Sequence, residues 1–148
     1  MTYRVRSAEE RRTEIQANAA AMGIDEAFIS TLVDSFYTRI RRDERLGPIF
    51  DDAIHDWYGH MPVMKAFWSS VALSTGQYSG KPVPTHMKLE GIEKADFQIW
   101  LGLFYKTLED IAPSEEAIPY FMQRAERIAA SLQLAMFGLP SLNESIHT

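Results

Sequence analysis

Four side chains of this sequence could carry out chemistry together, namely those of His86, His60, Tyr37 and Trp100. An imidazole can bind a metal ion, whereas a phenol hydroxyl and an indole N–H donate hydrogen bonds. Any one of them alone can be an ordinary core residue whose polar atom is paired. Together they favour a flat apolar cofactor, with one imidazole bound to iron and polar groups facing it across the plane.

The stretch from Tyr78 to Leu89, YSGKPVPTHMKL, places His86 directly after a pair of prolines. Pro82 and Pro84 fix two backbone φ angles and remove two N–H donors, so only a short helical turn can begin behind them. A metal-binding imidazole benefits from such a stiff mount, because its other nitrogen needs a fixed hydrogen-bond acceptor. His86 is therefore a candidate metal ligand.

Composition limits the class of protein. A chain of 148 residues with 46% hydrophobic residues fits a single domain over residues 1–148. The absence of cysteine excludes disulfides, thiolate metal sites and covalent haem attachment through paired cysteines. The net charge of −5, with both signs interspersed, predicts neither nucleic acid nor anionic lipid as a partner. Because no apolar run suits a membrane span or a signal peptide, we expect a soluble, cytoplasmic protein.

Apolar residues recur at helical spacing without strand alternation, so we predict an all-α fold. A capping box of Ser7 and Glu10 predicts an N-terminal extension helix within residues 1–23. Asp25 should cap a second helix, and a turn at Leu46-Gly47-Pro48 should end it, with the next apolar residues lying off the helix end.

Three further helices are expected. One should run from Asp56 to about Ser74, and Pro62 should kink it unless the helix begins near that residue. The clearest spans Glu93 to Ile111 and carries Trp100 on its apolar face. Ser114 should cap the last helix, and residues 141–148 should form a flexible tail.

The second and third helices also carry polar groups on their apolar faces. Tyr37 lies on the stripe of the second helix. The apolar face of the third comprises Trp57, His60, Met61, Met64, Phe67, Trp68 and Val71.

The chain resembles the truncated haemoglobins, specifically their third or P group. The resemblance runs from about Ile29 to Leu134 and depends on FYTRIRRDERLGPIF, on His60 ahead of Phe67-Trp68, on GQYSGKPVPTHMKL and on FQIWLGLFYKTL. It implies a truncated globin-like helical sandwich around a haem pocket that holds haem b without a covalent bond.

The resemblance also implies a role for each candidate. His86 would be the proximal ligand of the haem iron, Tyr37 the distal tyrosine, and Trp100 the distal tryptophan. His60 would face the ligand from the distal helix, and Phe50 would pack on the porphyrin. Met64 and Phe67 are expected to line the cofactor as well.

The chain departs from the family pattern beside His60. Pro62 could move the start of the distal helix, and Gly59 adds backbone freedom. We therefore expect that His60 can swing between a closed distal pocket and an open gate.

The presence of two hydrogen-bond donors, Tyr37 and Trp100, predicts that a bound diatomic ligand is released slowly. Tyr37 and Trp100 could each stabilise partial negative charge on a bound diatomic ligand by roughly 1.5 to 3 kcal/mol. NO dioxygenation or peroxide reduction therefore fits better than oxygen transport. We expect O2, CO, NO or peroxide as small ligands, an unidentified reductase as electron donor because the sequence shows no reductase domain, and a monomer or weak dimer.

Three other interpretations stay open. An axial methionine, from Met61, Met64 or Met87, would close the second iron position and favour electron transfer. A cofactor-free helical interaction module would use the same histidines and aromatic residues as core. A carboxylate di-metal bundle needs paired Glu-x-x-His motifs, and the chain offers only Asp52 with His55.

Overall fold

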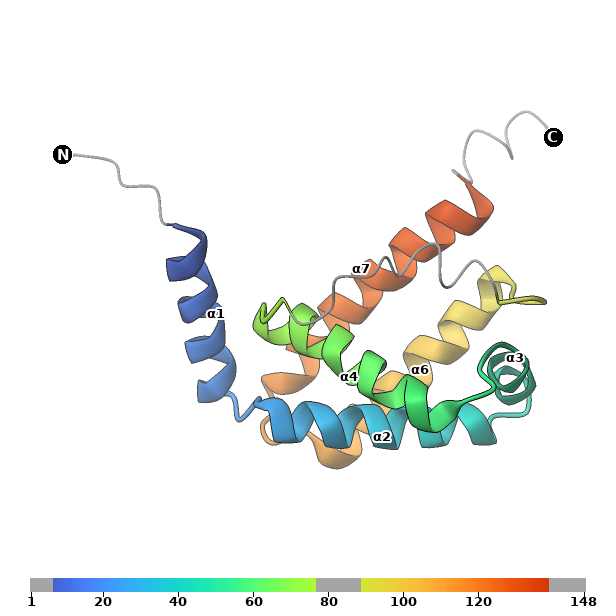
Figure 1. The fold of residues 1–148 in the computed structure, drawn as a ribbon, viewed down its shortest axis with the longest axis horizontal. Coiled ribbons are helices and arrows are strands. Elements are labelled where there is room, and N and C mark those ends of the chain that lie inside the picture. The colour runs from blue at the N-terminus through green and yellow to red at the C-terminus, as the bar shows by residue number, and fades with distance from the viewer. Residues whose placement is uncertain (1–6, 77–88, 139–148) are drawn as a thin grey trace.

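The computed structural model describes residues 7–76 and 89–138, and within them the chain is built from α-helices without strands (Figure 1). The helices are α1 (Ala8–Ala21), α2 (Glu26–Arg42), α3 (Leu46–Ala53), α4 (Trp57–Leu73), α6 (Lys94–Ile111) and α7 (Ala117–Phe137). The all-α prediction is confirmed. His86 and the expected tail over residues 141–148 lie outside the described residues.

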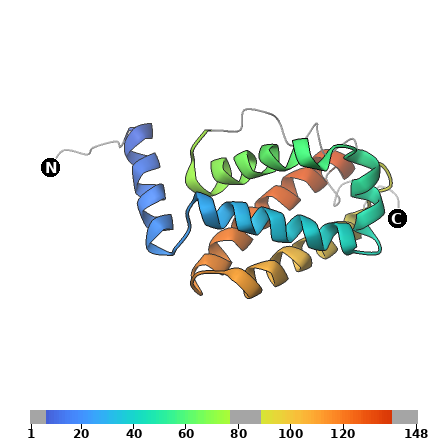
Figure 2. The ribbon, with the colours of Figure 1, turned by 60° about the horizontal axis from the view of Figure 1, so that its bottom comes forward.

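The helices form two packed pairs, α2 with α4 and α6 with α7. α2 packs on α3, α4 and α6, whereas α7 packs on α6 and also reaches α4. Figure 2 shows α4 and α2 running side by side with α6 and α7 behind and below them, and α1 standing apart at one end. This helical sandwich positions the aromatic faces of α2, α4 and α6 toward one another.

Three predicted helix starts are confirmed by their capping bonds. The Ser7 hydroxyl accepts a hydrogen bond from the Glu10 amide at 3.1 Å, and Asp25 accepts one from the Phe28 amide at 2.8 Å. Glu93 is the N-cap residue of α6 and forms a capping box with the third residue of that helix. Each bond satisfies an amide that the first helical turn leaves without a partner.

The predicted turn at Leu46-Gly47-Pro48 is wrong, because α3 begins at Leu46 and includes all three residues. A proline in the first turn of a helix sacrifices no intrahelical hydrogen bond, so the same sequence suits a turn and a helix start. Asp43 decides between them, since its carboxylate accepts from the Leu46 amide at 2.8 Å. Phe50 therefore lies within a helix, with its side chain 5% exposed.

Gly47 permits α3 to begin close to the end of α2. A Cβ atom at this position would lie 2.6 Å from the carbonyl oxygen of Arg41, far inside van der Waals contact. The tight α2–α3 corner brings Phe50 toward the face of α2 that carries Tyr37.

The predicted capping role of Ser114 is also wrong. α7 begins at Ala117, and its N-cap residue, Glu116, makes no capping bond with its side chain. The chain first makes a turn in which the Ala117 amide donates to the Ser114 carbonyl at 3.3 Å. The Ser114 hydroxyl instead donates to the Met22 carbonyl at 2.7 Å and fastens the α6–α7 connection to the end of α1.

Pro62 lies inside α4 without ending it. The helix begins at Trp57, where Asp56 accepts from the Gly59 amide at 3.0 Å, so the proline falls early in the helix. Its ring removes the hydrogen bond that would run back to the carbonyl of Tyr58, a residue that is 93% exposed. His60 therefore lies inside α4, with its amide donating to the Asp56 carbonyl at 3.0 Å.

The core lies where the two helix pairs meet. Phe104 of α6 stacks on Trp68 of α4 with ring centres 4.9 Å apart, and on Trp100 with ring centres 5.9 Å apart. Phe36 of α2 meets Phe104 edge to face at 4.9 Å. These contacts join α2, α4 and α6 through one buried aromatic cluster.

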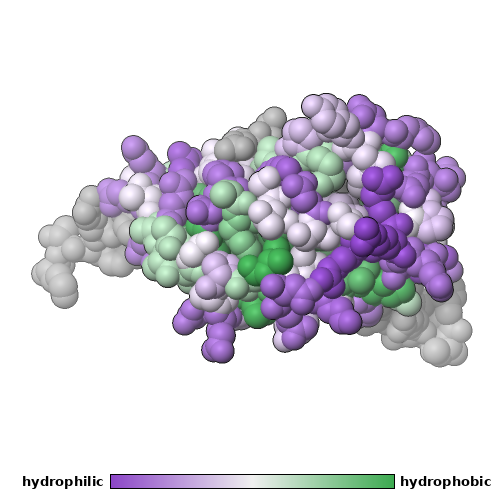
Figure 3. Space-filling model, turned by 90° about the horizontal axis from the view of Figure 1, so that it is seen from below, coloured by the Kyte–Doolittle hydropathy of each residue, from purple (hydrophilic) through white to green (hydrophobic). Residues whose placement is uncertain are grey.

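The surface is mixed in character. Figure 3, which views the molecule from below, shows hydrophilic residues over most of this face with apolar residues interspersed. None of the described helices combines the length and the apolar character that a bilayer crossing requires.

Candidate functional site

Tyr37 is a buried polar residue of the candidate site. Only 3% of this residue is exposed, and its hydroxyl donates to the sulfur of Met64 at 3.9 Å. The ring also contacts Phe50 and Trp57, with centres 6.3 Å and 6.0 Å away. Burial raises the pKa of the Tyr37 hydroxyl well above its ordinary value, so the group stays protonated. Because a thioether is a weak acceptor, a stronger acceptor could take its place at the Tyr37 hydroxyl.

Trp100 lies on the adjoining face of α6. Its indole meets Phe36 edge to face at 5.5 Å, and Phe36 in turn contacts Tyr37 at 5.1 Å. Phe104 stacks beneath the indole with an interplanar angle of 4° and fixes its plane. The Trp100 N–H makes no hydrogen bond to any residue within the described ranges. Two donors on neighbouring helices thus share one aromatic contact, Phe36.

His60 lies in the second turn of α4, half-buried beside Trp57. The two rings meet edge to face at an interplanar angle of 89°, with centres 6.4 Å apart. Trp57 also contacts Tyr37, so it links the two polar residues that the sequence placed on the distal side. Met64, one turn further along α4, completes the connection through its sulfur.

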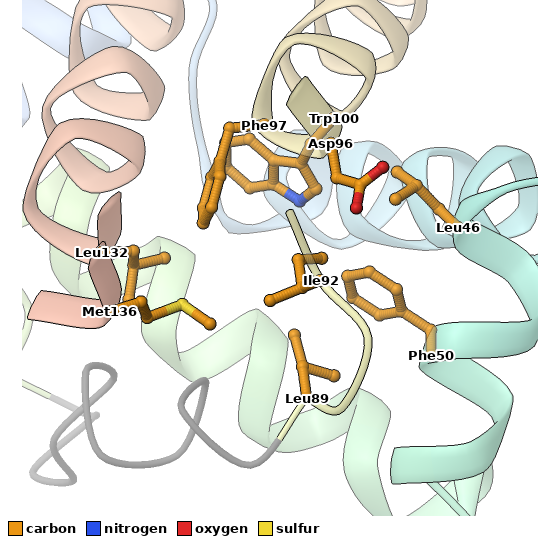
Figure 4. Close-up of a pocket in the computed structure, with 9 residues that line it drawn as sticks. All are labelled: Leu46, Phe50, Leu89, Ile92, Asp96, Phe97, Trp100, Leu132 and Met136. Atoms are coloured by element: carbon orange, nitrogen blue, oxygen red, sulfur yellow. The ribbon is translucent and has the colours of Figure 1, made fainter. Parts of the chain in front are cut away.

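A cavity opens next to these residues, between α3, α6, α7 and the chain that leads into α6 (Figure 4). Its enclosed volume is about 20 Å³, so the walls lie close together. The walls are formed by Leu46, Phe50, Leu89, Ile92, Asp96, Phe97, Trp100, Leu132 and Met136. Figure 4 shows the side chains of Phe50, Leu89 and Ile92 converging below Trp100. A flat apolar group suits such walls.

Among the described residues of the cavity wall, Asp96 is the charged one, and it is paired with Arg45. The Arg45 guanidinium donates to both carboxylate oxygens at 2.8 Å and to the carbonyl oxygen of Gly91 at 2.7 Å. The hydrogen bond from Arg45 lowers the pKa of Asp96 below its ordinary value. Asp96 is 3% exposed, so its charge is neutralised inside the wall and does not disturb the apolar character of the cavity.

The structure brings together most of the residues predicted to form the site. Tyr37, His60, Trp100, Phe50 and Met64 are joined by the ring and sulfur contacts given above.

Phe67 and His86 complete the set of predicted site residues. Phe67 lies further along α4 against Trp68, with ring centres 5.5 Å apart. The predicted proximal ligand, His86, lies outside the described residues.

Two residues of the site were missed. Trp57 was placed on the apolar face of α4 but given no role, although a tryptophan at the first helical position beside an aspartate was a usable signal. Asp96 was also missed. The one signal for it in the sequence was its spacing from Glu93, which suits a capping box and does not indicate a place in a cavity wall.

The chemistry of the described site suits a haem. Within the described part of the chain, a buried hydroxyl that donates to a thioether lies beside an apolar cavity, and an indole N–H without a partner lies in the cavity wall. Within the described ranges no three His, Cys, Asp or Glu residues gather as a metal-binding group, so the di-metal interpretation finds no support there.

The chain is similar to one relative of known sequence and to one solved structure, both from Campylobacter jejuni. It is 35% identical over 118 residues to the group 3 truncated hemoglobin ctb of Campylobacter jejuni subsp. jejuni serotype O:2, covering 77% of this chain and 92% of the relative. The crystal structure of a group III truncated hemoglobin from Campylobacter jejuni has a TM-score of 0.72 to it at 34% identity, over 77% of this chain and 92% of that one. No family model matches.

Fold and relatives together define a truncated globin, a class of haem protein that binds small ligands. At this identity and coverage the chain belongs to the group 3 truncated haemoglobins. The predicted family and helical sandwich are therefore confirmed, and the cofactor-free interaction module is not favoured.

Proposed function

We propose that this protein binds dioxygen and other diatomic ligands reversibly at a non-covalent haem b and that it acts on them, by NO dioxygenation or peroxide reduction. The observation that carries the proposal is the buried Tyr37 hydroxyl, which stays protonated and, among the residues that the structure describes, has the Met64 sulfur as its partner. A donor buried without a strong acceptor is costly unless a ligand supplies one.

Several residues would hold the haem. His86 would bind the iron from the proximal side, and Phe50 and Trp100 would pack against the macrocycle from the cavity wall. Met64 and Phe67 would contact it from α4. When bound, the haem would supply an iron that binds O2, CO, NO or peroxide. Since the chain has no cysteine, no thioether bond to the haem can form.

Tyr37 and Trp100 would stabilise negative charge on the ligand. Each donor is worth roughly 1.5 to 3 kcal/mol when its acceptor is effectively charged. Because the pKa of Tyr37 is raised, its hydroxyl donates throughout the physiological pH range. Ligands that carry negative charge would then leave slowly, which suits turnover better than transport.

His60 would control access to this side of the pocket. It is half-buried in the second turn of α4 and has Gly59 directly before it. We propose that its imidazole swings between a closed and an open position. A separate reductase would return the electrons that repeated turnover consumes.

Absorption spectra of protein purified with supplied haem test the proposal. We expect a Soret band that shifts when the ferrous protein takes up CO. Protein that is folded and helical but takes up no haem would show the proposed function to be wrong.

A second measurement tests the chemistry. Oxygenated protein should consume NO, or reduced protein should consume peroxide, faster than it releases oxygen. Tyr37→Phe provides the control, since it keeps the ring and removes the donor. Oxygen release faster than both reactions would support transport instead.

A further inference from the structure

Trp57 contacts both polar residues of the distal side. It is the first residue of α4, and its ring centre lies 6.0 Å from that of Tyr37 and 6.4 Å from that of His60. His60 follows it by three positions, so the two side chains lie on the same face of the helix. A change in the position of the indole would therefore change the space open to the imidazole.

Two charged side chains from other helices hold the indole in place. The Trp57 N–H donates to a carboxylate oxygen of Asp51, on α3, at 2.9 Å. The Arg41 side chain of α2 pairs with the same oxygen at 3.3 Å, and its guanidinium carbon lies 4.6 Å from the indole ring centre. We call Arg41, Asp51 and Trp57 the tryptophan clamp.

The tryptophan clamp lies at the surface and not in the core. The side chains of Arg41 and Asp51 are each 48% exposed. An ion pair at this exposure is weakened by salt, because mobile ions screen charges that face water. The clamp is thus firm enough to orient an aromatic ring and weak enough to respond to its surroundings.

We propose that the tryptophan clamp is a positioning device that limits the swing of His60 and so sets how fast ligands reach the haem. The inference rests on the proposed function, in which His60 gates the distal side. With the indole fixed edge to face against it, the imidazole cannot turn toward the start of α4. Release of the indole gives the imidazole this additional space and keeps the gate open for longer.

The rate of CO association tests the proposal, because CO is uncharged and salt can act on it only through the protein. Trp57→Phe removes the N–H and keeps a ring. Asp51→Ala removes the carboxylate that accepts from the indole N–H and pairs with Arg41, so the indole is still present but is released. We expect each variant to take up CO about three- to tenfold faster, as loss of one ordinary, partly exposed hydrogen bond implies.

Salt provides a second signature. Between about 10 mM and about 1 M salt the screening length falls from about 30 Å to about 3 Å. The wild-type CO association rate should rise about twofold over this range, as loss of one exposed ion pair implies. Trp57→Phe and Asp51→Ala should show no such dependence, since the clamp is already broken.

Asp34→Ala is the matched control. Asp34 of α2 pairs with Lys65 of α4 at 3.1 Å and is 57% exposed, so this pair joins two of the same helices away from Trp57. This variant should keep the wild-type rate and its salt dependence. In haem-free protein, the imidazole proton resonances of His60 should shift in Asp51→Ala and stay unchanged in Asp34→Ala, because only the former moves the indole.

The outcomes separate this inference from the proposed function. Wild-type protein that takes up no haem overturns the proposed function and this inference with it. Wild-type CO binding with unchanged or slower association in Trp57→Phe and Asp51→Ala overturns the inference alone. So does a wild-type rate that salt does not change, or a control variant that behaves like Asp51→Ala.

Discussion

At the scale of single residues, burial determines which side chains can act as permanent donors. Tyr37 is enclosed by Phe36, Phe50 and Trp57, and this enclosure raises the pKa of its hydroxyl. The same burial leaves the hydroxyl with a thioether as its acceptor. A ligand that brings partial negative charge into this pocket would offer the hydroxyl a stronger acceptor than Met64 does.

Removing either donor should act mainly on oxygen release. Tyr37→Phe and Trp100→Phe should each accelerate oxygen dissociation about ten- to a hundredfold, equivalent to ~1.5 to 3 kcal/mol. CO release should change much less, because CO is nearly neutral. Stopped-flow release measurements on both variants and the double variant check this, and the double variant should be non-additive because the donors share one acceptor. Parental oxygen release with retained haem would mark both residues as core only.

His86 carries the proposed bond to iron. His86→Ala should lose stable haem or give a five-coordinate site that added imidazole restores, because a free imidazole can occupy the place of the side chain. Haem content and the ferrous absorption spectrum measure the effect. His55→Ala is a suitable control, since it removes a histidine outside the proposed pocket. A normal spectrum in His86→Ala would remove His86 as the ligand.

At the scale of the elements, the Arg45–Asp96 pair determines how α6 begins. Asp96 accepts from the Glu93 amide at 2.7 Å, while Arg45, just before α3, binds its carboxylate and the Gly91 carbonyl. Gly91 has φ +83°, a left-handed conformation that favours glycine. The pair therefore joins α3, the turn at Gly91 and the start of α6, and these three features position Leu89 and Ile92 in the cavity wall.

Asp96→Asn should destabilise the protein in a pH-dependent way. The hydrogen bond from Arg45 lowers the folded-state pKa of Asp96 below its ordinary value of 3.8, so the pairing contributes stability above that value. As the pH falls through the folded-state pKa, the carboxylate is protonated and the contribution is lost. We expect Asp96→Asn to lower the free energy of unfolding by about 1 to 2 kcal/mol at neutral pH.

Denaturant unfolding of the wild type and Asp96→Asn at several pH values measures this difference, which should shrink below about pH 4. Asp110→Asn is the control, since it also breaks a pair between an arginine and α6, with Arg39, but at a site that is 59% exposed. That change should be worth at most about 1 kcal/mol. A difference for Asp96→Asn that is independent of pH would show that the carboxylate charge does not matter.

At the scale of the whole molecule, local sequence patterns were sufficient to predict the helices, whereas contacts between distant residues determine the geometry of the site. Helical spacing was sufficient to place Tyr37 and Phe104 in the core. It could not find the Arg45–Asp96 pair, whose members lie 51 positions apart. Pro48 was misread as part of a turn because proline suits both a turn and a first helical turn, and only the contact from Asp43 decides between them.

The attachment of α1 shows which part of the fold the site requires. Ala19 is its one fully buried residue, and Gln16 donates to the Leu73 carbonyl at 3.0 Å, at the end of α4. Neither contact touches the cavity wall, which α3, α6 and α7 provide. We therefore interpret residues 1–23 as an extension that supports the sandwich from one end.

Deletion of residues 1–18 should consequently lower stability without altering ligand binding. The deletion removes the Gln16 hydrogen bond and most of α1 but keeps Ala19, so we expect a loss of about 1 to 2 kcal/mol in the free energy of unfolding. Gln16→Ala, which removes the one side-chain bond, should account for about 0.5 to 1.5 kcal/mol of it. Denaturant unfolding measures the loss of stability, and the CO association rate of the haem-loaded protein tests whether ligand binding is unaltered. An altered CO rate in the deletion variant, with Gln16→Ala unchanged, would show that α1 acts on the pocket and is more than a support for the end of α4.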